Sequence, residues 1–268
     1  ICSIAGIRPL VWEVHNAHTG VPRTIIRTAL AVVPITRGLA KWYESRGVPA
    51  DSLHVAPDAV DLQSFSKVDR EISRVFLRSQ LGIPEHSQVA LYVGSFGLYA
   101  WKGVDIAKKA AEIIPDVIWL FVGGSAKECE DLTRGAAPNI RTLPRARRED
   151  IPMLLSGADV LLLPNKSGDP ASERDTSPMK LFEYMASGVP IVASDISSLR
   201  EILDDHTAFL IPPNNPQALA ESVRKVLADP TEATRRANAA RTAVEAYTWD
   251  KRAEGMLNFL KQRTDRPS

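Results

Sequence analysis

The start of one predicted helix is suited to an anion. Ser177 is a good N-cap residue, and Pro178 fits the first helical turn, where its missing N–H costs nothing. The open N–H groups at 177–180 and the positive end of the helix dipole there would suit a phosphate. Lys180 adds a mobile cation at the same end. These residues together predict a phosphate-binding site.

Two carboxylates accompany this helix start. Glu183 lies eight positions beyond Asp175, so the loop can present one carboxylate while the helix presents the other. Such an arrangement could hold a sugar nucleotide, with its diphosphate at the helix start and hydroxyls at the carboxylates. Lys180 and Glu183 are also three apart on the helix, which fits an ordinary surface ion pair worth roughly 0.2–0.5 kcal/mol. Both interpretations stay open at this point.

A second loop with polar residues follows a predicted strand at 89–94. Gly94 permits a tight turn, Ser95 follows it, and Lys102-Gly103 begins the next helix near where a diphosphate could lie. A solvated lysine at a helix start is the alternative. No Gly-x-Gly-x-x-Gly follows a strand in the sequence, which argues against a dinucleotide fingerprint.

Two further places carry groups that could contact a substrate. His15 ends the apolar segment 11–14, and a histidine at a strand end could donate a hydrogen bond to a sugar hydroxyl or a leaving-group phosphate. A purely structural histidine is the alternative. Arg145, Arg147 and Arg148 follow another strand end and could approach a nucleotide, an anionic acceptor or a membrane headgroup, although a solvated loop explains them more simply.

These residues sit within a regular alternation of short apolar runs and amphipathic stretches. The apolar runs predict six strands, at 89–94, 117–123, 140–143, 160–164, 190–194 and 208–212. The amphipathic stretches between and after them predict helices near 103–114, 126–134, 148–156, 178–187, 197–203 and 216–228. This pattern predicts a parallel sheet with right-handed crossovers, in which ligands bind beyond the carboxyl ends of the strands. Gly188 is placed to end the helix at 178–187.

The first 66 residues show the same alternation in abbreviated form, with strands at 10–15, 32–35 and 53–56 and helices at 21–31 and 37–46. We expect these residues to be the back half of a second, similar domain. A charged helix at about 68–80 leads into the larger repeat. Helices at about 231–246 and from Trp249 to about Lys261 complete the chain.

Composition excludes several classes of protein. The chain has 268 residues, 44% of them hydrophobic and 24% charged, which is ordinary for a globular protein. A net charge of +1 argues against a nucleic-acid-binding protein. The two cysteines predict neither a metal site nor a disulfide, so we expect a cytoplasmic, reducing compartment. The chain begins at Ile1 without a signal-like or membrane-spanning segment, and we expect it to be a fragment.

The segment from Ser177 to Ala186, Ser-Pro-Met-Lys-Leu-Phe-Glu-Tyr-Met-Ala, resembles the donor-site helix of family 4 glycosyltransferases, which have the GT-B fold. That family pairs two acidic residues with seven between them, here Asp175 and Glu183. The first is normally Glu, so Asp175 is a departure.

The segments Lys102-Gly103, His15 and Pro57–Asp61 support the resemblance with lower specificity. Lys102-Gly103 matches a family lysine, but Ser95-Phe96 stands where many members have Arg. His15 is similar to a strand-end histidine that faces the donor sugar in the family. Trp249 resembles an aromatic residue at the start of a terminal helix that crosses back to the first domain, although a helix capping its own domain is the alternative.

The resemblance runs from about Trp12 to Leu260 and implies an α/β protein of GT-B type, truncated at its N-terminus. It would have one complete Rossmann-like parallel-sheet domain plus the back part of a second. The predicted division is a partial N-terminal domain at 1–66, a linker at 67–86, a donor-binding domain at 87–246 and a terminal helix at 247–268.

The resemblance also implies a retaining glycosyltransferase without a cofactor or an essential metal. Its donor would be a UDP-, GDP- or ADP-sugar, and its acceptor a glycan, polysaccharide or lipid precursor, with peripheral membrane contact left open. The implied catalytic residues are Lys102, Asp175, Glu183 and His15, and the implied donor-binding residues are Gly94, Ser95, Lys102, Gly103, Thr176, Ser177, Pro178, Met179, Lys180 and Glu183. A non-catalytic nucleotide-sugar-binding module and a sugar-nucleotide 2-epimerase are the alternatives.

Overall fold

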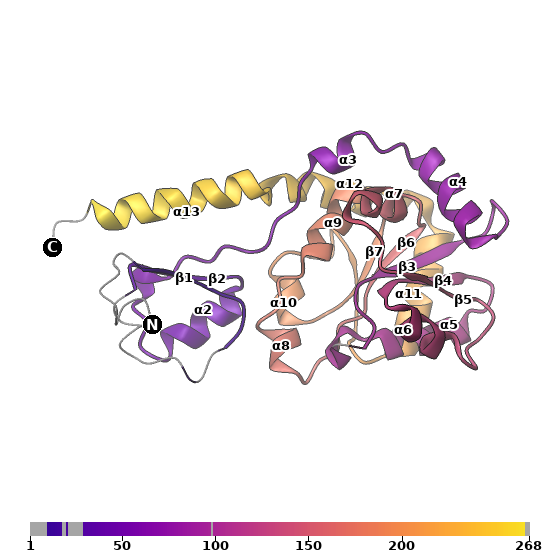
Figure 1. Ribbon diagram of the computed structural model, residues 1–268, viewed down its shortest axis with the longest axis horizontal. Coiled ribbons are helices and arrows are strands. Elements are labelled where there is room, and N and C mark those ends of the chain that lie inside the picture. Colours follow the sequence, from indigo (N-terminus) through magenta and orange to yellow (C-terminus); the bar gives the residue numbers. More distant parts are fainter. Residues whose placement is uncertain (1–9, 18–19, 21–28, 98, 266–268) are drawn as a thin grey trace.

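The computed structural model describes residues 10–17, 20, 29–97 and 99–265, and these form two lobes joined by a crossing helix (Figure 1). The larger lobe contains a six-stranded sheet with the order β5-β4-β3-β6-β7-β8, and all its strand pairs are parallel. The strands are β3 (Val89–Val93), β4 (Ile118–Gly124), β5 (Ile140–Pro144), β6 (Val160–Leu163), β7 (Ile191–Ser194) and β8 (Phe209–Ile211). The order reverses between β3 and β6, and ligands of such sheets bind beside this point.

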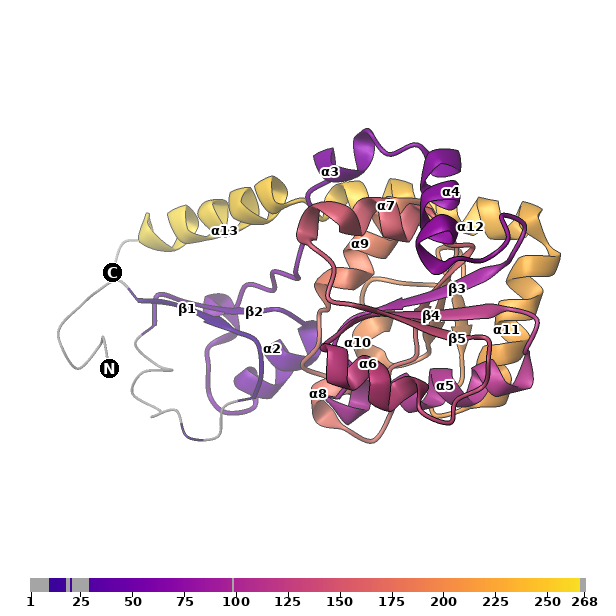
Figure 2. The ribbon, with the colours of Figure 1, turned by 45° about the vertical axis from the view of Figure 1, so that its right-hand side comes forward.

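Helices cover both faces of the sheet (Figure 2). The first core, which contains Leu155, Phe182 and Met185, packs α7 and α9 onto one face, and a second core packs α5 and α11 onto the other. The helices of this lobe are α4 (Arg70–Leu81), α5 (Val104–Ile113), α6 (Ala126–Thr133), α7 (Ile151–Ser156), α8 (Pro170–Glu173), α9 (Met179–Ser187), α10 (Ser197–Arg200), α11 (Pro216–Ala228) and α12 (Pro230–Ala243). Short 3₁₀ turns lie at Ala100–Lys102, Arg148–Asp150 and Val244–Ala246.

The smaller lobe has two parallel strands, β1 (Val11–Val14) and β2 (Ala31–Pro34), with α2 (Arg37–Glu44) packed against them and a 3₁₀ turn at Ala50–Ser52. The predicted strand at 53–56 is reduced to a single bridge between Leu53 and Val32. Most of the predicted helix at 21–31 lies outside the described residues, and Ala31 belongs to β2 instead.

The segment 67–86, predicted as a linker, contains a helix that packs on the larger lobe. A short helix, α3 (Gln63–Ser66), precedes it. Leu77 of α4 joins the core, and the buried guanidinium of Arg78 donates to Asp159 Oδ2 at 2.7 Å and to the carbonyl of Gly157 at 2.8 Å. Because these groups are fully enclosed, α4 belongs to the larger lobe.

The terminal helix α13 (Trp249–Thr264) leaves the larger lobe and lies along the smaller one (Figure 1). Its Met256, Phe259 and Leu260 pack on a small apolar cluster formed by Ala31, Val33 and Ala56. None of the helices that the structure describes is long and apolar enough to cross a bilayer.

Candidate functional site

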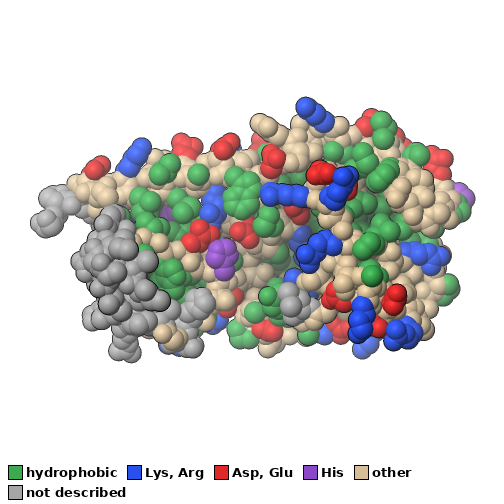
Figure 3. Space-filling view, in the orientation of Figure 1, with side chains coloured by type: hydrophobic (Ala, Val, Ile, Leu, Met, Phe, Trp, Pro, Cys, Tyr) green, Lys and Arg blue, Asp and Glu red, His purple; other side chains and the backbone are tan. Residues whose placement is uncertain are grey.

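A cleft of about 510 Å³ lies between the two lobes, at the carboxyl ends of β3 and β6. The larger lobe contributes the loop after β3 and the loop from β6 to α9. The smaller lobe contributes His15, Asn16, Ile35 and Asp58. Figure 3 shows acidic, basic and histidine side chains around the hollow between the lobes. The sequence places the site at this edge of the sheet, and the structure forms a cavity there.

Two lysines of the larger lobe line the cleft. Lys102 Nζ donates to Ser95 Oγ at 2.9 Å and lies 4.8 Å from the centre of the Tyr99 ring. Lys180 Nζ is buried 4.1 Å from the centre of the Tyr92 ring and has no hydrogen-bond partner among the described residues. Burial and the charge of Lys102 lower the pKa of Lys180 to about 7, against the opposing effect of Glu183. An anion in the cleft would offset both the burial of this ammonium group and its repulsion from Lys102.

Gly94 and Gly103, at the two ends of the loop after β3, have different roles. Gly94 has a φ of +149°, and a Cβ there would lie 3.2 Å from Lys180 Nζ, so glycine leaves room for this ammonium group. Gly103 has a φ of +72°, and a Cβ would lie 1.8 Å from the carbonyl oxygen of Pro164. Among the described residues, neither Gly103 nor Ser95 lines the cleft, and Ser95 Oγ contacts the cleft lysine Lys102. The structure therefore gives Gly103 a packing role.

The start of α9 differs from the prediction in one respect. The helix begins at Met179, with Pro178 as its N-cap and no capping side chain, so the prediction of Ser177 as the N-cap is wrong. Ser177 Oγ instead accepts a hydrogen bond of 3.0 Å from the backbone N–H of Asp58 in the smaller lobe. The positive end of the helix still lies at the cleft, where Thr176, Ser177, Pro178 and Met179 form part of the lining.

Asp175 lines the cleft, but both its oxygens are held by the protein. Arg174 binds them with two hydrogen bonds, of 2.6 Å to Oδ1 and 3.1 Å to Oδ2. The backbone N–H of Ala17, from the smaller lobe, donates to Oδ2 at 3.2 Å. The short side chain of Asp175 is therefore fixed at the junction of the lobes.

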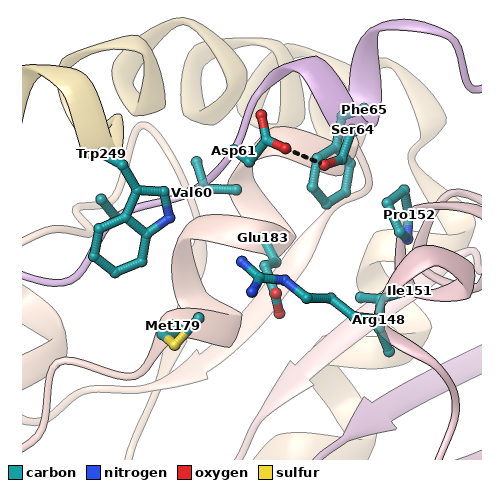
Figure 4. A pocket seen from close by; sticks show the side chains of 11 residues that line it. Val60, Asp61, Ser64, Phe65, Arg148, Ile151, Pro152, Met179, Glu183 and Trp249 are labelled. Carbon is teal, nitrogen blue, oxygen red and sulfur yellow. Dashed lines mark hydrogen bonds between the residues drawn. The ribbon is translucent and has the colours of Figure 1, made fainter.

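Glu183 does not line the large cleft. Residues three apart on a helix are turned by about 60° from each other, so Glu183 and Lys180 point into neighbouring spaces. Glu183 lines a small cavity of about 20 Å³. Met179 lines both this cavity and the large cleft, and so lies between them. Arg148 and Glu183 point toward each other there (Figure 4). Burial raises the pKa of Glu183, and the charges of Arg148 and Lys180 partly offset this effect.

The histidine of the smaller lobe stands at the cleft with a fixed partner. His15 Nε2 lies 3.0 Å from Glu13 Oε1, and Arg252 of α13 donates to the same oxygen at 2.8 Å. Asp58 lies on the same wall of the cleft, and burial raises its pKa against the charges of His15 and Arg252. The smaller lobe thus brings a histidine and a carboxyl group to the cleft.

Sequence reasoning missed two residues of the cleft. It also did not distinguish among Arg145, Arg147 and Arg148. Asp58 had no assigned role, and Asn165 was overlooked although it follows an apolar strand at the ligand-binding edge. Arg147 pairs with Glu149 and Asp150 on the surface, whereas Arg148 lines the small cavity. Among the described residues, no group of three or more His, Cys, Asp or Glu side chains could hold a metal ion.

The fold and the cleft define a GT-B protein with a lysine-lined cleft between two lobes. Residues 73–243 match the family model described as glycosyl transferases group 1. A D-inositol 3-phosphate glycosyltransferase of Xylanimonas cellulosilytica is 31% identical over 232 residues, covering 82% of this chain and 54% of the relative. The chain belongs to the group 1 glycosyl transferase family.

Two other comparisons extend this result. A phosphatidyl-myo-inositol mannosyltransferase of Mycobacterium tuberculosis is 27% identical over 221 residues, covering 79% of this chain and 54% of the relative. The crystal structure of Anabaena Alr3699/HepE in complex with UDP-glucose has a TM-score of 0.78 at 22% identity, covering 99% of this chain and 74% of that one. This likeness shows the fold. The chain spans about half the length of the curated relatives it matches.

Proposed function

We propose that this chain is the donor-binding part of a retaining glycosyltransferase that transfers a sugar from a nucleotide-activated donor. The observation that carries the proposal is the buried ammonium of Lys180. It lies at a helix start, near Lys102, without a hydrogen-bond partner among the described residues. Charge that grows on a departing diphosphate would be stabilised by both lysines and by the helix dipole.

We assign the remaining predicted site residues to the ribose and the sugar of the donor. Glu183 lies in the small cavity beyond Met179, and there we expect it to accept hydrogen bonds from the nucleotide ribose, because a carboxylate can receive two hydroxyls. Asp175 and the backbone at Thr176 orient the sugar, and His15 approaches it from the smaller lobe. The bond from the anomeric carbon to the diphosphate oxygen breaks, the acceptor oxygen bonds to that carbon on the same face, and the proton of the acceptor hydroxyl passes to the departing diphosphate oxygen.

The lysines of the cleft suggest the class of donor, and the names of two relatives suggest the class of acceptor. A UDP-, GDP- or ADP-sugar would supply the diphosphate that the lysines bind. The acceptor would be a glycan, a polysaccharide or a lipid precursor. Two relatives are named for D-inositol 3-phosphate and phosphatidyl-myo-inositol, so we include a cyclitol phosphate or its lipid among the acceptors.

The proposal is tested by measuring the affinity for UDP, GDP and ADP of the wild type and of Lys180→Met, Lys102→Ala and Glu183→Ala. Loss of one hydrogen bond to a charged group costs about 1.5–3 kcal/mol, so each lysine variant should bind roughly ten- to hundredfold more weakly. Lys180→Met removes a buried charge, and we expect its thermal stability to be at least that of the wild type.

Lys109→Met is the matched control, because Lys109 is exposed on α5 away from the cleft. We expect its affinity to equal that of the wild type. Unchanged affinity in Lys180→Met and Lys102→Ala would remove the donor-site assignment. Transfer itself is to be measured with a longer protein that includes residues before Ile1, with sugar products followed by NMR.

A further inference from the structure

Asn165 carries a buried side-chain amide without hydrogen bonds to other described residues. It lies two residues beyond β6, is 1% exposed, and lines the large cleft together with Lys102, Ala171 and Asp175. Neither Nδ2 nor Oδ1 has a hydrogen-bond partner among the described residues. A buried polar group without a partner is costly, and such groups are rare in native proteins. This side chain therefore points to a ligand.

A second buried asparagine differs from Asn165 in its Nδ2, although its Oδ1 likewise has no hydrogen-bond partner among the described residues. Asn139 is 4% exposed, and its Nδ2 donates to the carbonyls of Ala111, Ile114 and Val117 at 2.9–3.2 Å. It holds the end of α5 to the start of β4. Asn165 makes no such contact, although it is buried more deeply.

The backbone on both sides of Asn165 is fixed. Before it, the carbonyl of Pro164 lies so close to Gly103 that no Cβ fits between them. After it, the Lys166 backbone N–H donates to the carbonyl of Trp101 at 2.7 Å, and the Lys166 ammonium binds Asp105 at 2.7 Å. Ordering of Asn165 is thus complete before a ligand arrives, which reduces the entropy cost of binding.

The chemistry of the amide selects the part of the ligand that it contacts. Its Nδ2 is a donor and its Oδ1 an acceptor. Diphosphate oxygens only accept, so they would pair with Nδ2 and leave Oδ1 facing negative charge. Hydroxyl groups donate and accept, so two adjacent hydroxyls can satisfy both atoms.

On the basis of the proposed function, we propose that Asn165 binds adjacent hydroxyl groups of the sugar that is transferred. Asn165 then contributes to binding of the sugar: it adds affinity for the nucleotide sugar over the free nucleoside diphosphate. Asp175 lies on the same cleft wall and, held by Arg174 and Ala17, offers its remaining acceptor capacity to the same ring.

The test is a comparison of two affinities in the wild type and in Asn165→Leu, measured by calorimetry on this chain. The probes are UDP-glucose with UDP, and GDP-mannose with GDP. We expect Asn165→Leu to bind the nucleotide sugar roughly tenfold more weakly, while its affinity for the free diphosphate stays within about twofold of the wild type. Asn165→Ser, which keeps a hydroxyl at lower volume, should fall between the two.

Asn258→Leu, the same change at an exposed position of α13, should leave both affinities unchanged. If Asn165→Leu keeps the full preference for the nucleotide sugar, the role of Asn165 is refuted while the donor site stands. If it weakens both ligands equally, the amide contacts the diphosphate and the inference is also refuted. If the wild type binds none of the four probes, and neither ADP-glucose nor ADP, the proposed function fails with it.

Discussion

Two connections hold the smaller lobe to the larger one, and they differ in chemistry. The first, called here the helix connection, is mainly apolar: Met256, Phe259 and Leu260 of α13 pack on the cluster Ala31, Val33 and Ala56, and Arg252 of the same helix adds hydrogen bonds. The second, called here the cleft connection, consists of polar contacts beside the cleft. Glu201 accepts from the N–H groups of Arg37 and Gly38 at 2.7 and 2.9 Å, Thr36 Oγ donates to the carbonyl of Arg174, and Ser177 accepts from Asp58.

The difference indicates which connection is permanent. Separation of the helix connection would expose apolar surface, which is unfavourable in water. Separation of the cleft connection exposes polar groups that water can solvate, so its net stabilisation is small. We therefore expect the lobes to part at the cleft and to stay joined at α13, which lets a ligand enter and lets closure position His15 and Asp175.

The largest effect is expected at the helix connection. Phe259→Ala removes a partly buried ring that also stacks on His54, with ring centres 4.8 Å apart. We expect the free energy of unfolding, measured with urea, to fall by about 2 kcal/mol. Leu257→Ala, at a position 57% exposed on the same helix, should change it by less than about 0.5 kcal/mol. Equal losses in the two variants would contradict an apolar connection here.

A pH effect of intermediate size is expected in the cleft. Free Lys180 has a pKa of about 7, and a bound diphosphate raises it because an anion favours the ammonium form. Between the two pKa values, binding takes up a proton, so affinity falls as the pH rises above 7, by up to about tenfold per pH unit. Calorimetry in buffers of different ionisation enthalpy measures this uptake. Lys180→Met should abolish the slope, and a slope that persists would place the titrating group elsewhere.

The smallest effect is expected at the cleft connection. Glu201→Gln keeps one acceptor oxygen and loses the charge that faces the start of α2, so we expect a loss of about 0.5 kcal/mol of stability. The fraction of open molecules, followed by fluorescence transfer between labels on the two lobes, should rise roughly twofold. Glu221→Gln, on the exposed face of α11, is the control. A loss as large as that of Phe259→Ala would erase the distinction between the connections.

The larger lobe was predictable from the sequence because its signals are local. Each of its six strands begins and ends within one residue of the predicted bounds, since short apolar runs are bounded by glycine, proline or polar residues. Gly188 ends α9 with a φ of +67°, as predicted. Lys102 and Lys180 line one cleft because parallel strands present their carboxyl ends at one edge.

The errors came from contacts between distant segments. Ser177 has the composition of an N-cap, but the partner of its hydroxyl is 119 residues away at Asp58. The strand predicted at 53–56 has an apolar pattern, yet only Leu53 forms a bridge to β2. Asn165 gave no spacing signal, because its significance lies in the absence of partners for its amide among the described residues. Such facts exist only after the chain has folded.

The path of α13 has a practical consequence for anyone who divides this protein. Arg252 reaches from that helix to Glu13, the neighbour of His15, and to the carbonyls of Ala56 and Pro57. The smaller lobe is therefore supported by α13, through contacts between residues 195 to 239 positions apart in the sequence. A chimera that replaces the smaller lobe with that of a relative must take α13 from the same relative. Otherwise the hydrogen bond that Arg252 makes to Glu13, beside His15, will be lost.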